Sequence, residues 1–160
     1  MMEPAPAPTT EDTGTAELLT FRTGGQRYAV DILDVREIRG WSTPTPLPYA
    51  PTYMRGMVNL RGLVLPVMDL AQRLGLPPSA DDPRNIIIVV QAGERVHGLL
   101  VEAVADIVQT DMDMIQDAPR LCDDGKATAE RLLLLGDEMV QILSIGRILP
   151  PLQSIVETAA

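Results

Sequence analysis

The sequence contains few side chains of the types that catalyse reactions or bind metals. It has one histidine, His97, in the stretch RVHGLLVE, and one cysteine, Cys122, in the polar stretch LCDDGKA. His97 occupies a position where a strand would accept valine, so we expect a structural histidine rather than a catalytic one. Cys122 has neither a second cysteine nor a nearby histidine, which argues against a disulfide, a metal site or a Cys–His pair.

The acidic residues do not form a recognisable site either. The stretch DMDMIQD (111–117) resembles the start of a calcium loop, but Ile115 and Gln116 stand where a liganding side chain and a glycine are needed. A solvated acidic turn is the better interpretation. The chain also has no glycine-rich phosphate loop and no G-x-S-x-G motif. We therefore predict no catalytic residue, no metal and no cofactor.

One cation stands out because of its surroundings. Arg61 lies in the middle of GMVNLRGLVLPVMDL (56–70), a stretch that reads as two short apolar strands. A buried strand avoids an unpaired charge, because desolvating a charge costs several kcal/mol or more. Arg61 therefore either has an internal partner, for which Glu37 in VREI is the natural candidate, or faces a groove that another molecule fills.

Composition limits the kinds of protein that this chain could be. Its 160 residues suit one domain or two small joined lobes, and with 46% hydrophobic but 3% aromatic residues the core must be aliphatic. The net charge of −9 argues against nucleic acid or an anionic membrane surface. No apolar run approaches the ~18 residues of a membrane span. The start of the chain lacks the pattern of a secretory signal, so we expect a soluble, cytoplasmic protein.

The local patterns predict a mainly β chain. Residues 1–16 are rich in proline, alanine and acids and are expected to be disordered. Two β-rich runs around Gly24-Gly25 predict a hairpin. The spacing of Ile32, Val35 and Ile38 allows a short helical turn, whose apolar side chains could be core or could contact a partner helix.

Proline and glycine then divide the rest of the first half. Prolines at 44, 46, 48 and 51 predict an ordered connection over 42–56 without a helix or a central strand. A short helix is expected after residue 70 and should stop at Gly75 and the Pro77-Pro78 pair.

The second half of the chain repeats the first. Four pieces recur in the same order, which chance explains less easily than any single piece: Leu18-Leu19-Thr20-Phe21 with Ile86-Ile87-Ile88-Val89, Val35-Arg36-Glu37-Ile38 with Val104-Ala105-Asp106-Ile107, Leu60-Arg61-Gly62 with Leu134-Leu135-Gly136, and Val67-Met68-Asp69-Leu70 with Ile142-Leu143-Ser144-Ile145. We infer two lobes, about 17–75 and 85–146, each of about five short strands closed into a barrel, with a shared core or a groove between them. Leu135 replaces Arg61 in the second half, so the fold itself does not require arginine there.

Several of these motifs together resemble the CheW-like family of bacterial chemotaxis coupling proteins. The segments that carry the resemblance run from residue 17 to about 149: the first hairpin, VREIRG, the proline-rich connection, VNLRG, LPVMDL, IIIVVQAGERVHGLLVEAV and GDEMVQILSIGRIL. The resemblance implies one CheW-like domain over 17–150, made of two interleaved, SH3-like five-stranded β-barrels with short helices, followed by a tail over 151–160.

The resemblance also implies a function and its surfaces. A protein of this family is a non-enzymatic adaptor between the cytoplasmic tip of a transmembrane chemoreceptor and the histidine kinase CheA, whose regulatory domain has the same fold. Carried over by position, the receptor groove would involve Ile32, Val35, Glu37, Gly56, Arg61, Gly62 and Ile107. The kinase surface would lie on the second lobe around Ile86 and Ile87. The protein would be cytoplasmic and recruited to receptor arrays.

Other functions remain as alternatives. An enzyme could use the groove between the lobes, although the missing catalytic constellation argues against it. A nucleic-acid-binding barrel is opposed by the negative charge and the scarcity of aromatic residues. Within the family, the chain could serve a non-flagellar pathway or resemble the regulatory domain of the kinase, but the complete two-lobe pattern favours a free-standing adaptor.

Overall fold

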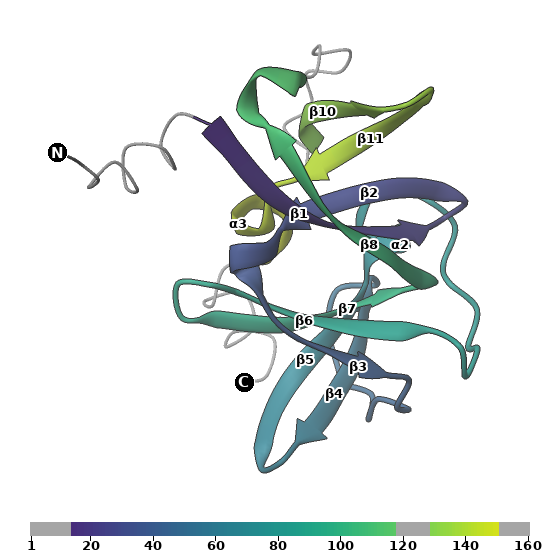
Figure 1. The fold of residues 1–160 in the computed structure, drawn as a ribbon. Coiled ribbons are helices and arrows are strands. Elements are labelled where there is room, and N and C mark those ends of the chain that lie inside the picture. Colours follow the sequence, from purple (N-terminus) through teal and green to yellow (C-terminus); the bar gives the residue numbers. More distant parts are fainter. Residues whose placement is uncertain (1–13, 118–128, 151–160) are drawn as a thin grey trace, which may run out of the picture.

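Two antiparallel-rich sheets dominate the computed structural model, which describes residues 14–117 and 129–150 (Figure 1). Sheet A has the order β8-β1-β2-β11-β10-β9 and consists of β1 (Thr15–Thr23), β2 (Gln26–Asp31), β8 (Ala103–Asp111), β9 (Ile115–Asp117), β10 (Ala129–Leu135) and β11 (Glu138–Leu143). Sheet B has the order β3-β6-β7-β5-β4 and consists of β3 (Val35–Gly40), β4 (Met54–Leu60), β5 (Leu63–Asp69), β6 (Ile86–Ala92) and β7 (Arg95–Val101).

Four short helical segments follow these strands within residues 14–117 and 129–150. They are the 3-10 turns η1 (Ile32–Asp34) and η2 (Met112–Met114) and the α-helices α2 (Leu70–Arg73) and α3 (Ile145–Ile148). The mainly β, two-lobed fold expected from the sequence is confirmed. No helix within 14–117 or 129–150 is long and apolar enough to cross a membrane.

The two halves of the chain exchange strands. Strands β1 and β2 lie in sheet A, whereas β3, β4 and β5 of the same half lie in sheet B. The second half does the reverse, with β6 and β7 in sheet B and β8 to β11 in sheet A. Equivalent strands of the sequence repeat, such as β1 and β6, occupy equivalent places in the two sheets. Each sheet therefore contains strands from both 17–75 and 85–146, and the repeat units do not coincide with the sheets.

A shared core lies between the sheets and joins them. Among the residues that the structure describes, fifteen buried residues form it: Leu19, Phe21, Tyr28, Val30, Met54, Met68, Leu70, Ile88, Val90, Leu99, Val101, Leu143, Ile145, Ile148 and Leu149. The outer face of each sheet covers a smaller cluster, one around Val67 and Ile87 in sheet B and one around Leu18 and Ile142 in sheet A. Central strands are thus buried on both faces, which explains why the sequence shows continuous apolar runs there instead of alternation.

The local expectations are mostly confirmed, with three corrections. The hairpin of β1 and β2, the irregular proline-rich connection and the short helix before Gly75 are present, but the connection ends earlier than residue 56, because β4 begins at Met54. However, β1 begins at Thr15, inside the range expected to be disordered; residues 1–13 and the tail from 151 lie outside the described part of the chain. The helical turn covers Ile32–Asp34 alone, and Val35 and Ile38 lie in β3 instead. A β-bulge between Val35 and Glu37 keeps Val35 and Ile38 on the same face of that strand, opposite Val90 and Ile88 of β6.

Candidate functional site

Arg61 lies in a tight turn between β4 and β5, not in a buried strand as the sequence suggested. Its φ of 52° is followed by a φ of 88° at Gly62, and Leu60 pairs with Leu63. Two consecutive positive φ angles are the mark of a type I′ hairpin turn. The side-chain oxygen of Asn59 accepts a hydrogen bond from the Gly62 N–H at 2.8 Å and closes this turn. The Arg61 side chain is consequently 69% exposed.

The expected partner of Arg61 is present. Its Nη2 donates to Oε1 of Glu37 at 2.6 Å, and Arg39 Nη1 lies 3.5 Å from Oε2 of the same carboxylate. The hydrogen bond from Arg61 is the main reason why the pKa of Glu37 is lowered. Because Glu37 is on the edge strand β3 and Arg61 follows the edge strand β4, the pair connects the two open edges of sheet B.

Apolar packing holds both partners of this pair in place. Leu60, directly before Arg61, packs with Trp41 and Val96 against the outer cluster of sheet B. Trp41 follows β3, which carries Glu37. The ion pair therefore sits on a rigid apolar support, although its exposure to solvent limits what the pair adds to stability to roughly 0–1 kcal/mol.

The other residues of the expected receptor groove have different surroundings. Ile32 and Val35 are half-buried and pack against the shared core. Ile107 is 58% exposed on β8, the edge strand of sheet A. The structure thus brings Glu37 and Arg61 into contact, leaves Ile107 open to solvent on the other sheet, and gives Ile32 and Val35 a partly structural role.

The two glycines of the expected groove also differ. Gly56 has a φ of 144°, and a side chain on it would collide with the backbone of Thr45, which forms a β-bridge with Met57. The close approach at Gly56 is therefore made by the chain itself. A Cβ on Gly62 would meet no neighbouring atom, so glycine is favoured there by the positive φ of the turn and not by a lack of space.

The kinase residues inferred from the family are not equally accessible. Ile86 is half-buried at the start of β6. Ile87 is 2% exposed and belongs to the outer cluster of sheet B, so its side chain is not available to a partner in this conformation. Strand β6 lies in sheet B together with most of the first half, and not in a lobe formed by the second half.

His97 has the environment of a structural residue. It is 2% exposed on β7, and neither ring nitrogen has a hydrogen-bond partner among the described residues. Burial, assisted by the charge of Arg95, lowers the pKa of His97 to about 4. The imidazole is therefore neutral at pH 7 and out of contact with solvent. Cys122 lies outside the described residues, and residues 14–117 and 129–150 contain no group of three potential metal ligands.

Sequence reasoning missed two exposed apolar residues. Leu33 is 87% exposed on η1, and Tyr49 is 91% exposed in the proline-rich connection with a φ of 62°. A signal for Leu33 was available, because aspartate often accepts a hydrogen bond from the N–H two residues later and forces a tight turn. Asp31 does this, with its Oδ1 3.0 Å from the Leu33 nitrogen.

Comparisons with known proteins agree with this description. The model of the CheW-like domain matches residues 17–152. The chain is 43% identical over 133 residues to a probable chemotaxis protein CheW of Rhizobium etli, covering 82% of this chain and 86% of the relative. It is 41% identical over 138 residues to the chemotaxis protein CheW of Rhizobium meliloti, with 86% and 89% covered.

A solved structure shows the same fold. The scaffolding protein TtCheW from Thermoanaerobacter tengcongensis superposes with a TM-score of 0.74 at 29% sequence identity. The match covers 81% of this chain and 89% of that one.

Proposed function

Because this chain belongs to the CheW-like family, it is a non-enzymatic coupling adaptor of chemotaxis, and we propose that it joins a chemoreceptor to the histidine kinase CheA. The observation that carries the conclusion is the family match over 17–152, which spans both sheets and the shared core. The partners would be the helical cytoplasmic tip of the receptor and the regulatory domain of the kinase. The protein would be cytoplasmic, and receptor binding would recruit it to arrays at the membrane.

We propose that the receptor surface contains the Glu37–Arg61 pair and the exposed side chain of Ile107. The pair supports this proposal because the repeat has leucine in place of Arg61, so the fold does not need the charge. Ile107 adds an exposed apolar side chain on the neighbouring sheet. Ile32 and Val35 would supply the half-buried apolar edge, while Gly56 and Gly62 would shape the backbone beneath the contact.

Charge reversal tests the receptor surface. Arg61→Glu places two acids opposite each other, and we expect the affinity for a receptor cytoplasmic fragment to fall by roughly tenfold, measured by calorimetry. Arg61→Glu combined with Glu37→Arg should recover part of the loss, because a direct ion pair couples non-additively. Circular dichroism controls for unfolding. A double variant that is no better than the single one would contradict the role of the pair.

The kinase surface is tested separately. We propose that Ile86 contacts the regulatory domain of CheA, with Ile87 supporting it from the core. Ile86→Asp would have to desolvate a charge in that contact, so kinase binding should be lost while receptor binding is kept. Gln91→Asp, which adds the same charge at the other end of β6, is the matched control. Equal loss of both partners in folded Ile86→Asp would contradict two separate surfaces.

A further inference from the structure

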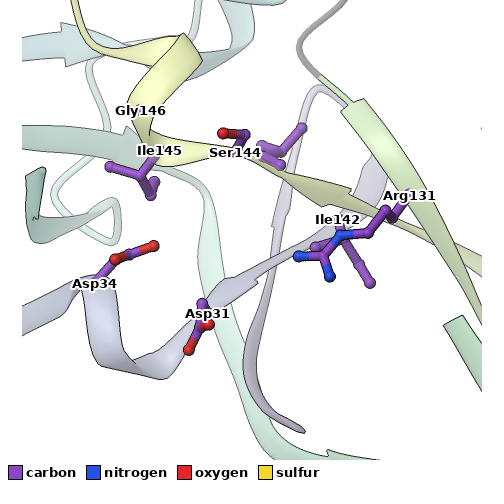
Figure 2. A pocket seen from close by; sticks show the side chains of 8 residues that line it. Asp31, Asp34, Arg131, Ile142, Ser144, Ile145 and Gly146 are labelled. Atoms are coloured by element: carbon purple, nitrogen blue, oxygen red, sulfur yellow. The ribbon is translucent and has the colours of Figure 1, made fainter. Parts of the chain in front are cut away.

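A small polar pocket lies beside the proposed receptor surface, between the end of β2 with η1 and the end of β11 with α3. Its volume is about 190 Å³, and it is lined by Asp31, Asp34, Arg131, Ile142, Leu143, Ser144, Ile145 and Gly146. Figure 2 shows the side chains of Asp34 and Arg131 entering it from opposite sides. Asp31 and Asp34, which line the pocket, are the chain neighbours of Ile32 and Val35 of the proposed receptor surface.

Two of the three charged side chains of the pocket have no partner among the described residues. Within the described part of the chain, neither Asp34 nor Arg131 makes a side-chain hydrogen bond or an ion pair. Arg131 comes from β10 and so approaches from a different element than Asp34 on η1. Asp31 uses one oxygen to accept from the Leu33 N–H. Burial and, after it, the charge of Asp31 raise the pKa of Asp34, and a cation placed beside the two carboxylates would offset both effects.

The volume and the net charge of the pocket limit which kind of ligand it could bind. Pockets for cofactors and drug-sized molecules usually measure ~300–1,000 Å³, so this one suits a single long side chain better. A metal ion would need more ligands than the pocket offers, and the described residues contain no cluster of three potential metal ligands. Two carboxylates against one guanidinium leave one net negative charge, on a protein whose net charge is already −9.

We propose that this pocket receives a lysine or arginine side chain of the helical receptor partner, which contacts Asp34. This inference rests on the proposed receptor binding and deepens it. Leu33, exposed beside the pocket, would pack against the apolar stem of the incoming side chain. Arg131 on the far wall repels a cation and sets the limit of how deeply the charge can enter. The contact would add specificity for receptors that carry a cation at this place.

The experiment is a calorimetric titration of the full-length protein with a receptor cytoplasmic fragment in the absence of kinase. We expect Asp34→Asn, which keeps the shape and removes the charge, to weaken binding by about fivefold. Arg131→Gln should strengthen it by about twofold, because a repulsive charge is removed. Asp113→Asn is the matched control: it removes an exposed carboxylate from η2, the other 3-10 turn, and should leave the affinity unchanged.

The outcomes distinguish the pocket from the adaptor function. If the unaltered protein does not bind the fragment, the proposed receptor binding fails. If it binds and Asp34→Asn behaves like Asp113→Asn, the pocket proposal alone is overturned. Weaker binding by Arg131→Gln would also overturn it, because the occupant would then be an acid or an acceptor. Alanine substitutions of the fragment's basic residues should reveal one whose effect disappears in Asp34→Asn, as expected for a direct contact.

Discussion

At the scale of single residues, His97 is a polar side chain that is buried in the core without a hydrogen bond from the described residues to offset its lost hydration. It alternates along β7 with Leu99 and Val101, both members of the shared core, so its ring lies on the same apolar face. Both ring nitrogens lack partners among the described residues. A buried polar group without a hydrogen bond costs about 1–3 kcal/mol. His97 therefore lowers stability, and nothing in the proposed adaptor function requires it.

We predict that His97→Val stabilises the protein and flattens its pH dependence. The pKa of about 4 in the folded state lies below the usual 6.5, so on acidification the unfolded chain binds the proton first. Protonation of His97 therefore has no effect on the free energy of unfolding above about pH 6.5. It lowers that free energy by at most about 3 kcal/mol as the pH drops from 6.5 to 4. Urea unfolding of both proteins at pH 7 and pH 4.5 measures this.

The comparison with the unaltered protein removes the contribution of the carboxylates, which titrate in both chains. The difference in unfolding free energy between the two proteins should be larger at pH 4.5 than at pH 7. An unchanged difference would show that His97 is protonated as readily in the folded protein as in the unfolded chain, which would contradict the lowered pKa. Binding of the receptor fragment and of CheA should be retained by His97→Val.

At the scale of elements, one β-bridge organises the proline-rich connection. The N–H of Thr45 donates to the Met57 carbonyl, and the N–H of Met57 donates to the Thr45 carbonyl, both at 2.8 Å. Gly56 sits beside this bridge, where the connection passes directly over its Cα. A chain segment with four prolines can form few regular hydrogen bonds, so this bridge holds it against β4.

We predict a large difference between two glycine substitutions in the same strand pair. Gly56→Ala combines an unfavourable φ with a collision against backbone, and we expect it to lower the free energy of unfolding by about 3 kcal/mol or more. Gly62→Ala has open space and should cost about 1–2 kcal/mol for the left-handed backbone alone. Chemical denaturation of both variants gives the comparison. Equal costs would mean that the connection can move away from β4.

At the scale of the whole molecule, strand exchange makes the two sheets interdependent. The shared core takes side chains from both halves of the chain. The end of helix α3 is also held by arginine side chains from β7 and α2. Arg95 on β7 donates to the Leu149 carbonyl at 2.9 Å, and Arg73 on α2 donates to the Ile148 carbonyl at 3.0 Å. The relative position of the proposed receptor and kinase surfaces is therefore fixed by the core, as a rigid adaptor requires.

We predict that neither half of the chain folds alone. A fragment of residues 1–80 would contain two strands of sheet A and three of sheet B, and each set would expose its share of the core. The NMR spectrum of such a fragment should show the poor chemical-shift dispersion of an unfolded chain. The full chain should unfold in a single transition. A well-dispersed spectrum for the fragment would contradict the interdependence of the sheets. Mixing both fragments should restore the native spectrum at least in part.

The sequence by itself determined the mainly β class, the internal repeat and the scarcity of side chains that could catalyse a reaction or bind a metal, and it named Glu37 as one candidate partner of Arg61. These features are local or periodic: glycine and proline mark turns, apolar runs mark buried strands, and a family motif covers contiguous residues. The repeated pieces of the sequence correspond to strands in equivalent positions of the two sheets, such as β1 and β6, so the sequence pattern alone identified equivalent strands.

Only the tertiary structure decided which sheet each strand joins, because exchange of strands between two similar halves leaves the apolar pattern of each strand unchanged. It also decided that Arg61 is exposed, that Ile87 is buried and that Asp34 faces a pocket. Arg61 reads as part of a strand, and its backbone leaves the strand because Asn59 and Gly62 close a turn. The exposure of a side chain depends on which distant segments pack over it, and that information is not present in its neighbours along the chain.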